Sequence, residues 1–311
     1  MGISKYLKIP QYEAKGFPAD RLNDIQELFA QAYNGRTISK EMLKWQMEDN
    51  PCLNARATSL WDGDKLIAYN ALTPSYAILE GKDIITAVSG TTMADIHYPG
   101  VSLQLFAECA SQNPEVVMTC GFPNRNSYGI TVKYLGYRYV GDVAFWTATA
   151  KTLGKNICIH EADQFSSDYE TISRNLSITH NFISARKSDY LNWRFFMKPE
   201  YEYHLYEYQD TQRRGYIVVD VYYEAEIPQL QIVDIIADSD EVFTALLDYA
   251  RTLAAEWHCS TVKLWLTSDY YSALLKSHDF IYGEHPFPMT IWQRDLDISK
   301  AYLTMMNSDI F

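Results

Sequence analysis

Two ionisable residues in the first half of the chain are spaced for proton-transfer chemistry. Asp95 and His97 lie two positions apart on a proposed central strand that continues past the predicted run 83–91, so their side chains project to one face. An imidazole titrates near neutral pH and can take a proton from an amine, and a nearby carboxylate can orient it. The pair can equally cap the strand end and hold the next loop. The sequence therefore allows two roles for Asp95 and His97, a general base and a structural pair.

Further polar residues could hold a ligand. Asn124 and Asn126 follow a predicted short strand, where amides can bind a cofactor, although Asn126 also suits a helix cap. Arg194, beside Trp193, can grip a diphosphate through two hydrogen bonds or form a salt bridge between domains. No histidine, cysteine or carboxylate falls at a metal-ligand spacing such as H-E-x-x-H or C-x-x-C, so we expect no metal.

The composition predicts a packed protein with little affinity for polyanions. The chain has 311 residues, 47% of them hydrophobic, which favours two domains. The 27 Lys and Arg against 39 Asp and Glu give a net charge of -12, so nucleic acid and anionic membranes are disfavoured as partners. The five cysteines are widely spaced, and no run of about 20 apolar residues occurs. We therefore expect a cytoplasmic protein.

Periodicity and turn residues predict the elements that carry these side chains. Helical spacing marks residues 22–33, 39–47, 101–111 and 126–135. Strands are predicted over 57–60, 65–74, 83–91, 116–120 and 137–148. Asp62-Gly63-Asp64 and Glu80-Gly81-Lys82 are hairpin turn signals.

A second copy of this order follows. Trp45 precedes Pro51 as Trp193 precedes Pro199, and residues 126–137 and 269–280 are similar capped helices after a strand. Chance similarity is the alternative to duplication. Duplication predicts an α+β fold of two tandem units, residues 1–150 and 186–311, each a mixed, mostly antiparallel sheet flanked by helices. Residues 151–185 would form a connecting segment.

Several motifs carry a resemblance to a known family. They are Trp45…Asn50-Pro51, the segment 91–103, Gly121-Phe122-Pro123-Asn124, Asn126-Ser127-Tyr128, Leu135-Gly136-Tyr137 and Tyr190-Leu191-Asn192-Trp193-Arg194. In these the chain resembles the GNAT acyltransferases, and within them the N-acyltransferases of bacterial surface-polysaccharide pathways that act on nucleotide-linked amino sugars such as 3-amino-3,6-dideoxyhexoses. The resemblance implies two tandem GNAT-like domains and an acyl-CoA co-substrate.

The resemblance also implies site residues. The cofactor-binding candidates are Ile96, Tyr98, Gly100, Val101, Ser102, Leu103, Asn124, Asn126 and Ser127. The catalytic candidates are His97, Asp95 and Tyr128, the last as the acid that protonates the leaving thiolate, although a strict register places Val132 at the family's tyrosine. The substrate-binding candidates are Trp45, Phe122, Trp193 and Arg194.

The phosphate-binding loop departs from the family pattern. Pro99-Gly100-Val101-Ser102 keeps one glycine of the usual Arg-Gly-x-Gly run and lacks the arginine, but a helix starting there still points free N–H groups at a phosphate. The matching stretch of the second unit, Ala237-Asp238-Ser239-Asp240-Glu241, holds three carboxylates. We therefore expect CoA in the first unit only, with the second unit as acceptor-site wall or scaffold.

The expected function is transfer of an acetyl or short 3-hydroxyacyl group from CoA to the amine of a dTDP- or UDP-linked amino sugar, by a monomer or a homodimer. One alternative is the tandem aminoacyl transferases that use aminoacyl-tRNA, which the acidic charge disfavours. The other is a non-catalytic acyl-CoA-binding regulatory module, suggested by the reduced glycine loop.

Overall fold

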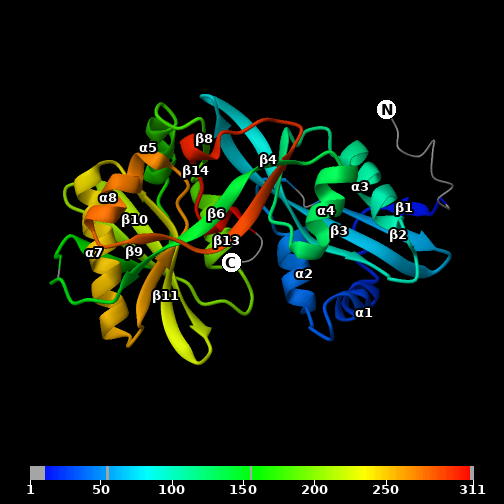
Figure 1. Cartoon of the computed structure of the whole chain (residues 1–311), viewed down its shortest axis with the longest axis horizontal. Helices are drawn as coiled ribbons and strands as arrows, with labels where there is room; N and C mark the ends of the chain where they lie inside the picture. Colours follow the sequence, from blue (N-terminus) through cyan, green and yellow to red (C-terminus); the bar gives the residue numbers. More distant parts are fainter. Residues whose placement is uncertain (1–10, 54–55, 155, 309–311) are drawn as a thin grey trace.

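The structure is a computed structural model that describes residues 11–53, 56–154 and 156–308. In this part of the chain the strands form one sheet in the order β1-β2-β3-β4-β5-β13-β6-β12-β11-β10-β9-β7, with β8 pairing to β3 and β14 to β8 (Figure 1). The strands are β1 (Glu13–Lys15), β2 (Arg56–Asp62), β3 (Lys65–Leu79), β4 (Lys82–Ala94), β5 (Met118–Gly121), β6 (Arg138–Thr149), β7 (Ile159–Ala162), β8 (Phe182–Ser184), β9 (His204–Gln209), β10 (Arg213–Glu224), β11 (Ile227–Ala237), β12 (Thr261–Leu264), β13 (Ile281–Trp292) and β14 (Ala301–Tyr302). The helices are α1 (Leu22–Ala32), α2 (Lys40–Met47), α3 (Val101–Gln112), α4 (Arg125–Tyr134), α5 (Asp168–Leu176), α6 (Ser188–Phe195), α7 (Asp240–Glu256) and α8 (Ser272–Ser277), with short 3-10 turns η2 (Asp269–Tyr271), η3 (Ile298–Lys300) and η4 (Met305–Asn307).

Local sequence signals form the first half as predicted. Gly63 and Gly81 adopt positive φ in the turns that join β2 to β3 and β3 to β4, which confirms both hairpins. Ser39 caps α2 by accepting a hydrogen bond from the Met42 N–H at 3.0 Å. β1 was not predicted; it adds to the edge of β2.

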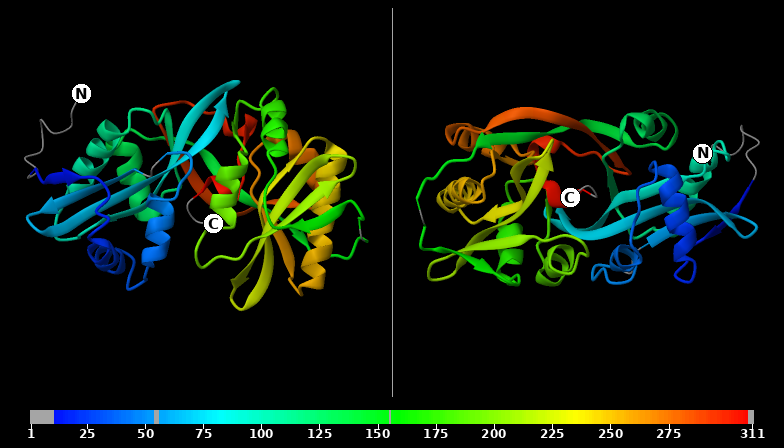
Figure 2. Two further views of the ribbon diagram at one scale, coloured as in Figure 1. Left: turned by 180° about the vertical axis from the view of Figure 1, so that it is seen from behind. Right: turned by 90° about the horizontal axis from the view of Figure 1, so that it is seen from below.

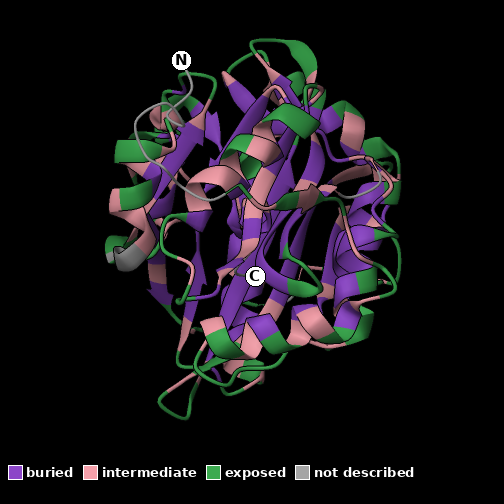
Figure 3. Cartoon of the chain, turned by 90° about the vertical axis from the view of Figure 1, so that its right-hand side faces the viewer, coloured by how far each residue is buried: buried purple, intermediate pink, exposed green. Residues whose placement is uncertain are grey.

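Helices cover both faces of the first half of the sheet. Ile25 of α1 joins Tyr69 and Met93 in a core beneath α1 and α2. Val101 and Leu105 of α3 pack instead with other residues of β2 and β3. α1 and α3 therefore lie on opposite faces, and buried residues gather on the strands between the helical layers (Figure 3).

Two long strands join the halves into a single sheet. β13, from the end of the chain, pairs with β5 of the first half and runs antiparallel to β6 along most of its length. β6 in turn pairs with β12 of the second half. Each half thus receives a strand from the other, and both strands cross the middle of the molecule in Figures 1 and 2.

The second half repeats the first. The order β11-α7-β12-α8-β13 copies β4-α3-β5-α4-β6, so the expected α+β fold of two tandem units is confirmed. Residues 151–185, expected as a connection, contain β7, α5 and the short β8, and β7 extends the sheet beyond β9. The division at residues 150 and 186 stays a prediction, because β13 crosses back into the first half.

Candidate active site

The parallel strands β4 and β5 diverge part-way along their length. They pair only over Thr86–Val88 and Met118–Cys120, after which β4 continues to its end at Ala94. A cavity of about 410 Å³ lies in the opening. Ser89–Ala94 of β4 form one wall and Gly121–Asn124, after β5, form the other, with α3 and α4 above. The two strands are therefore separated by an opening that the cavity occupies.

A bulge shapes the β4 wall of this cavity. Thr91 has a φ of +49°, and the pairing register with β3 shifts beside it. Asn70 of β3, fully buried, lies opposite. Its Oδ1 accepts hydrogen bonds from the hydroxyls of Ser89 at 3.0 Å and Thr92 at 2.6 Å, one on each side of the bulge. The Asn70 side chain therefore holds the two flanks of the bulge together.

Side chains from the α1 and α2 face hold the same backbone. The Tyr33 hydroxyl donates to the Thr92 carbonyl at 3.0 Å, and the Thr91 hydroxyl donates to Gln46 Oε1 at 3.3 Å. Among the described residues, β4 beyond Val88 has no strand partner on its β5 side. The bulge thus lines the cavity with a backbone segment that side chains hold in place, and backbone groups held in this way can bind carbonyl oxygens and amides.

Two helix N-termini border the cavity. α3 starts after Gly100, whose φ is +84°, and Ser102 in its first turn lines the cavity. At α4, Asn124 Oδ1 accepts a hydrogen bond from the Ser127 N–H at 3.0 Å. The cap is thus Asn124, and the prediction of a cap at Asn126 is wrong because the helix begins one residue before it. Both helix ends offer N–H groups and a positive dipole end to an anion.

The predicted proton-transfer pair lies outside the cavity lining. β4 ends at Ala94, so Asp95 and His97 occupy a turn and not the strand that was predicted. Asp95 is buried and accepts hydrogen bonds from Lys65 Nζ at 2.7 Å and from the His97 N–H at 2.9 Å. The Lys65 ammonium lowers the pKa of the Asp95 carboxyl. The His97 imidazole is exposed. A general-base role for the pair stays a prediction.

Several other residues predicted to bind the cofactor or take part in catalysis lie outside the lining of the 410 Å³ cavity. Ile96 is 85% exposed, and the Tyr98 hydroxyl donates to Asp62 at 3.0 Å. Val101 belongs to the core, and Leu103 lines a second cavity described below. Tyr128 packs edge-on against Tyr139, with ring centroids 6.1 Å apart, and does not line the 410 Å³ cavity. The Asn126 side chain lies outside the described part of the structure.

Residues that sequence reasoning missed complete the site. Tyr137, directly before β6, lines the cavity and is 6% exposed. Burial raises the pKa of its phenol, and a side-chain hydrogen bond with Ser89 acts in the opposite direction. Thr290 reaches the cavity from β13 of the second half and donates to the Gly121 carbonyl at 3.2 Å. Tyr137 stands in a motif that carried the resemblance, whereas the position of Thr290 depends on the strand exchange.

Trp45 and Trp193, predicted to bind substrate, contact each other. Their rings stack with centroids 4.5 Å apart, and each indole N–H donates to the other's carbonyl, at 2.9 and 3.1 Å. Both are buried and neither lines the cavity. The two matching helices α2 and α6 meet at this symmetric contact, so it joins the repeats. A substrate contact for either residue stays a prediction.

The two remaining residues predicted to bind substrate, Phe122 and Arg194, lie in different parts of the structure. Phe122 lines the cavity and packs against Trp265 of the second half, with ring centroids 5.4 Å apart. Arg194 is buried, and its Nη2 donates to the Ser308 carbonyl at 3.3 Å. Phe122 is thus placed to contact a ligand, whereas Arg194 holds the end of the described chain.

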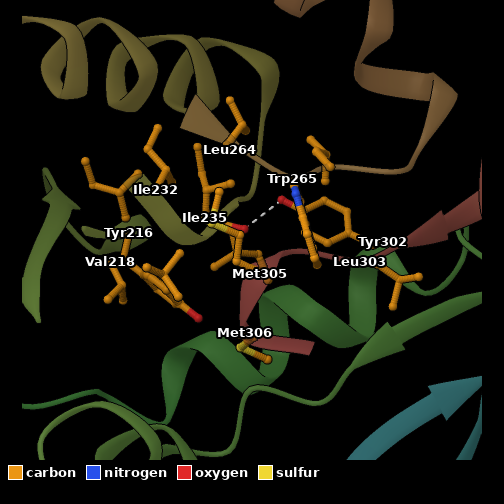
Figure 4. Close-up of a cluster of buried hydrophobic side chains, with 14 of the residues drawn as sticks. Tyr216, Val218, Ile232, Ile235, Leu264, Trp265, Tyr302, Leu303, Met305 and Met306 are labelled. Carbon is orange, nitrogen blue, oxygen red and sulfur yellow. Dashed lines mark hydrogen bonds between the residues drawn. The ribbon is translucent and has the colours of Figure 1, made fainter. Parts of the chain in front are cut away.

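The corresponding opening in the second half is filled by the chain itself. β11 and β12 also pair over three residues and then diverge. Tyr302 donates to the Ile235 carbonyl of β11 at 2.7 Å, and the Leu303 carbonyl accepts from the Thr267 N–H, after β12, at 3.3 Å. Residues 301–308 therefore bridge the two diverging strands, as Figure 4 shows for Tyr302 and the methionines beside it.

Two further observations limit the chemistry. Among the described residues, no three histidine, cysteine or carboxylate side chains gather where they could hold a metal ion. Within the same residues, every helix is too short or too polar to cross a bilayer.

Comparison with solved structures identifies the fold. No protein-family model matches the sequence, and no curated protein matches it. A probable N-acyltransferase from Enterococcus faecalis V583 is 14% identical, with a TM-score of 0.67 over 93% of this chain and 74% of that one. A GCN5-related N-acetyltransferase from Anabaena variabilis is 13% identical, with a TM-score of 0.68 over 90% and 72%. Saccharomyces cerevisiae N-myristoyltransferase with bound myristoyl-CoA is 11% identical, with a TM-score of 0.62 over 94% and 85%.

These similarities cover both halves of the chain. The fold is therefore the GNAT fold, present as two tandem copies within one sheet. The copies differ at the feature that matters for chemistry, because the opening is a cavity in the first and is filled in the second.

Proposed function

We propose that the protein is an acyl-CoA-dependent N-acyltransferase that binds its donor between β4 and β5. The opening between these strands is the observation that carries the proposal. Within the described residues, it leaves a strand edge without a strand partner beside a cavity of about 410 Å³, which falls within the range of about 300–1,000 Å³ typical of ligand sites. The pantetheine amides would pair with that edge as another strand would. The diphosphate would meet the N-terminal N–H groups of α3.

The reaction follows from this placement. The acceptor amine attacks the carbonyl carbon of the thioester, so that a C–N bond forms and the oxygen takes a negative charge. The C–S bond then breaks, and the nitrogen loses its proton. Backbone N–H groups of the bulge at Thr91 would donate to the oxyanion, an interaction worth about 2.7–4 kcal/mol in enzymes of known mechanism.

Tyr137 would protonate the departing thiolate. Its side chain belongs to the cavity lining, and its phenol is protonated at neutral pH, with a pKa that burial raises above the ordinary value of about 10. The proton lost by the amine then returns to the phenolate through solvent, which restores the enzyme. His97 and Asp95 lie outside the lining, and Asp95 is paired with Lys65, so we assign deprotonation of the incoming amine to solvent.

The donor site would occur once per chain. In the second half, residues 301–308 take up the opening, and Asp238, Asp240 and Glu241 surround the start of α7. Phosphates would meet like charges there. The second half instead contributes to the first site through Thr290 and through Trp265 behind Phe122.

We further propose a nucleotide-linked amino sugar as the acceptor and the cytoplasm as the location. The resemblance carried by Asn50-Pro51 and by the motif around Trp193 supports this choice. The net charge of -12 disfavours aminoacyl-tRNA as the alternative donor. A CoA-binding module without catalysis is the second candidate, because the loop at Gly100 lacks the family's arginine.

The test is a thermal-shift panel with CoA, acetyl-CoA, dTDP and UDP, followed by mass analysis of amino-sugar acceptors. A ligand at 100 times its dissociation constant stabilises by about 2.7 kcal/mol. Stabilisation by CoA and by a nucleotide, with acylated product, supports the transferase. Stabilisation by CoA without product on any amine supports the regulatory module, and no shift with any thioester contradicts both.

A variant of Gly100 tests whether the loop before α3 binds the CoA diphosphate. Gly100→Asp places a carboxylate at the start of α3 and should raise the dissociation constant for CoA at least about tenfold, since each 1.4 kcal/mol of lost binding is tenfold. Gly81→Asp is the matched control, because it also substitutes a positive-φ glycine, in a hairpin at the far end of β4. Equal CoA affinity in both variants would contradict the assignment of the CoA diphosphate to the loop at Gly100.

A further inference from the structure

A second cavity of about 400 Å³ adjoins the proposed donor site. It lies beneath α3 and α4, over the sheet. Apolar side chains from a strand, a helix and a loop line it, among them Leu72 of β3, Leu103 of α3 and Val116 before β5. Polar side chains also line it, among them Gln104 and Glu108 of α3, Asn113 after that helix and Thr119 of β5. The cavity therefore suits an apolar group that enters from one side.

The two cavities share a wall. Phe106, Leu135 and Tyr137 line both of them. The Phe106 and Tyr137 rings meet edge to face with centroids 6.2 Å apart, so aromatic side chains form part of the wall between the two cavities. Tyr137 is also the residue that the proposed function places at the sulfur of the thioester. The shared wall therefore lies where the acyl group begins.

We propose that the second cavity binds the acyl chain of the donor, and that the donor carries a medium or long aliphatic chain. This inference rests on the proposed function. It differs from the acetyl or short hydroxyacyl group expected from the resemblance. An acetyl group ends at the thioester and leaves the second cavity without an occupant, whereas each methylene of a longer chain would bury against Leu72, Leu103 and Val116.

Other parts of the donor fit this cavity poorly. The diphosphate and ribose phosphate are anionic, and Glu108 in the lining would repel them. The pantetheine arm carries two amides that would lose hydrogen bonds against the apolar side chains that form most of this lining. Both groups have better partners at the free edge of β4 and the start of α3. The aliphatic chain is the one donor group that gains from this lining.

The first test compares acetyl-CoA with octanoyl-CoA on the whole protein by calorimetry. A buried methylene is worth about 0.8 kcal/mol, which is about fourfold in affinity. We expect octanoyl-CoA to bind at least about tenfold more tightly than acetyl-CoA, and to be the better donor by kcat/KM. Equal affinity, or tighter binding of acetyl-CoA, would overturn the proposal while leaving the proposed function intact. Binding of neither thioester would contradict the proposed function itself.

A pair of variants tests whether the acyl chain of the donor binds in the second cavity. Ala110→Phe adds a ring to the lining on α3, and Ser111→Phe adds the same ring to an exposed position one residue on. Ala110→Phe should weaken octanoyl-CoA binding about tenfold or more and leave acetyl-CoA binding within about twofold, whereas Ser111→Phe should change neither. Retained acetyl-CoA binding also reports that the variant is folded. An equal loss for both thioesters in Ala110→Phe would place the CoA body in this cavity and overturn the proposal. If Ala110→Phe does not fold, the chain-length comparison on the unaltered protein still decides.

Discussion

At the scale of single residues, the role of a side chain in the candidate site depends on where the fold places it, more than on its residue type. Tyrosine is common in this chain, with 24 copies, so residue type alone could not distinguish Tyr137 from Tyr128. The structure separates them, because Tyr137 lines the cavity and Tyr128 packs against Tyr139 on another surface. Asp95 and His97 have suitable chemistry for a base, but the strand ends before them.

Tyr137→Phe should lower kcat by about 10²-fold or more and leave the KM for the acyl-CoA nearly unchanged. The substitution removes the hydroxyl that would donate the proton and keeps the aromatic ring. Steady-state kinetics measures this. Tyr139→Phe, at an exposed position, is the control and should behave like the unaltered protein. A loss of kcat in Tyr128→Phe with none in Tyr137→Phe would return the acid role to the residue that the resemblance implied.

His180 should make stability depend on pH. It is buried, with Nε2 at 2.9 Å from Ser268 Oγ and Nδ1 at 2.9 Å from the Leu176 carbonyl, and burial lowers its pKa below the usual 6.5. The folded protein therefore binds this proton less readily than the unfolded chain. Its contribution to stability is complete above about pH 6.5 and is lost as the pH falls through the lowered pKa.

Urea unfolding at about pH 7.5 and about pH 5.5 tests this assignment, with His180→Gln as the comparison. The unaltered protein should lose more free energy of unfolding on acidification than the variant does. The same loss in both proteins would assign the pH dependence to other groups.

At the scale of elements, the bulge in β4 shows what periodicity can and cannot predict. The turns at Gly63 and Gly81 and the cap at Ser39 were predictable because each depends on neighbouring residues. The bulge was not, since it depends on Asn70 of another strand hydrogen-bonding to Ser89 and Thr92. A buried asparagine within an apolar strand is the signal that could have indicated it.

Asn70→Ala should lower kcat more than it raises the KM for the donor, because the bulge amides lose their fixed position. It should also destabilise the fold by about 1–3 kcal/mol, the usual effect of leaving buried polar partners unsatisfied. Asn50→Ala is the matched control, as Asn50 is also buried and hydrogen-bonds to backbone away from the cavity. Equal kinetic effects in the two variants would show that Asn70 acts only through general stability.

At the scale of the whole molecule, the exchange of β6 and β13 makes the two copies one unit. The duplication could be predicted from the spacing of Trp45 and Trp193, and their stacked rings mark its pseudo-symmetry. The exchange could not, because pairing between residues far apart in the sequence, such as Thr147 with Ile281, leaves no local pattern. Thr290 enters the site only through this pairing.

The exchange predicts that the halves unfold together. Circular dichroism and intrinsic fluorescence should report one coincident transition in urea, and residues 1–150 expressed alone should not form a stable domain, because the place of β13 beside β5 would be empty. Two separate transitions, or a stable isolated first half, would contradict this view of the fold.

The central claim is that one CoA thioester binds per chain, in the opening of the first copy. Titration of the protein with acyl-CoA in a calorimeter measures this most directly, with Gly100→Asp and Gly81→Asp measured alongside. The account predicts one site per chain that weakens in Gly100→Asp and persists in Gly81→Asp. Two sites per chain, or none, would contradict it.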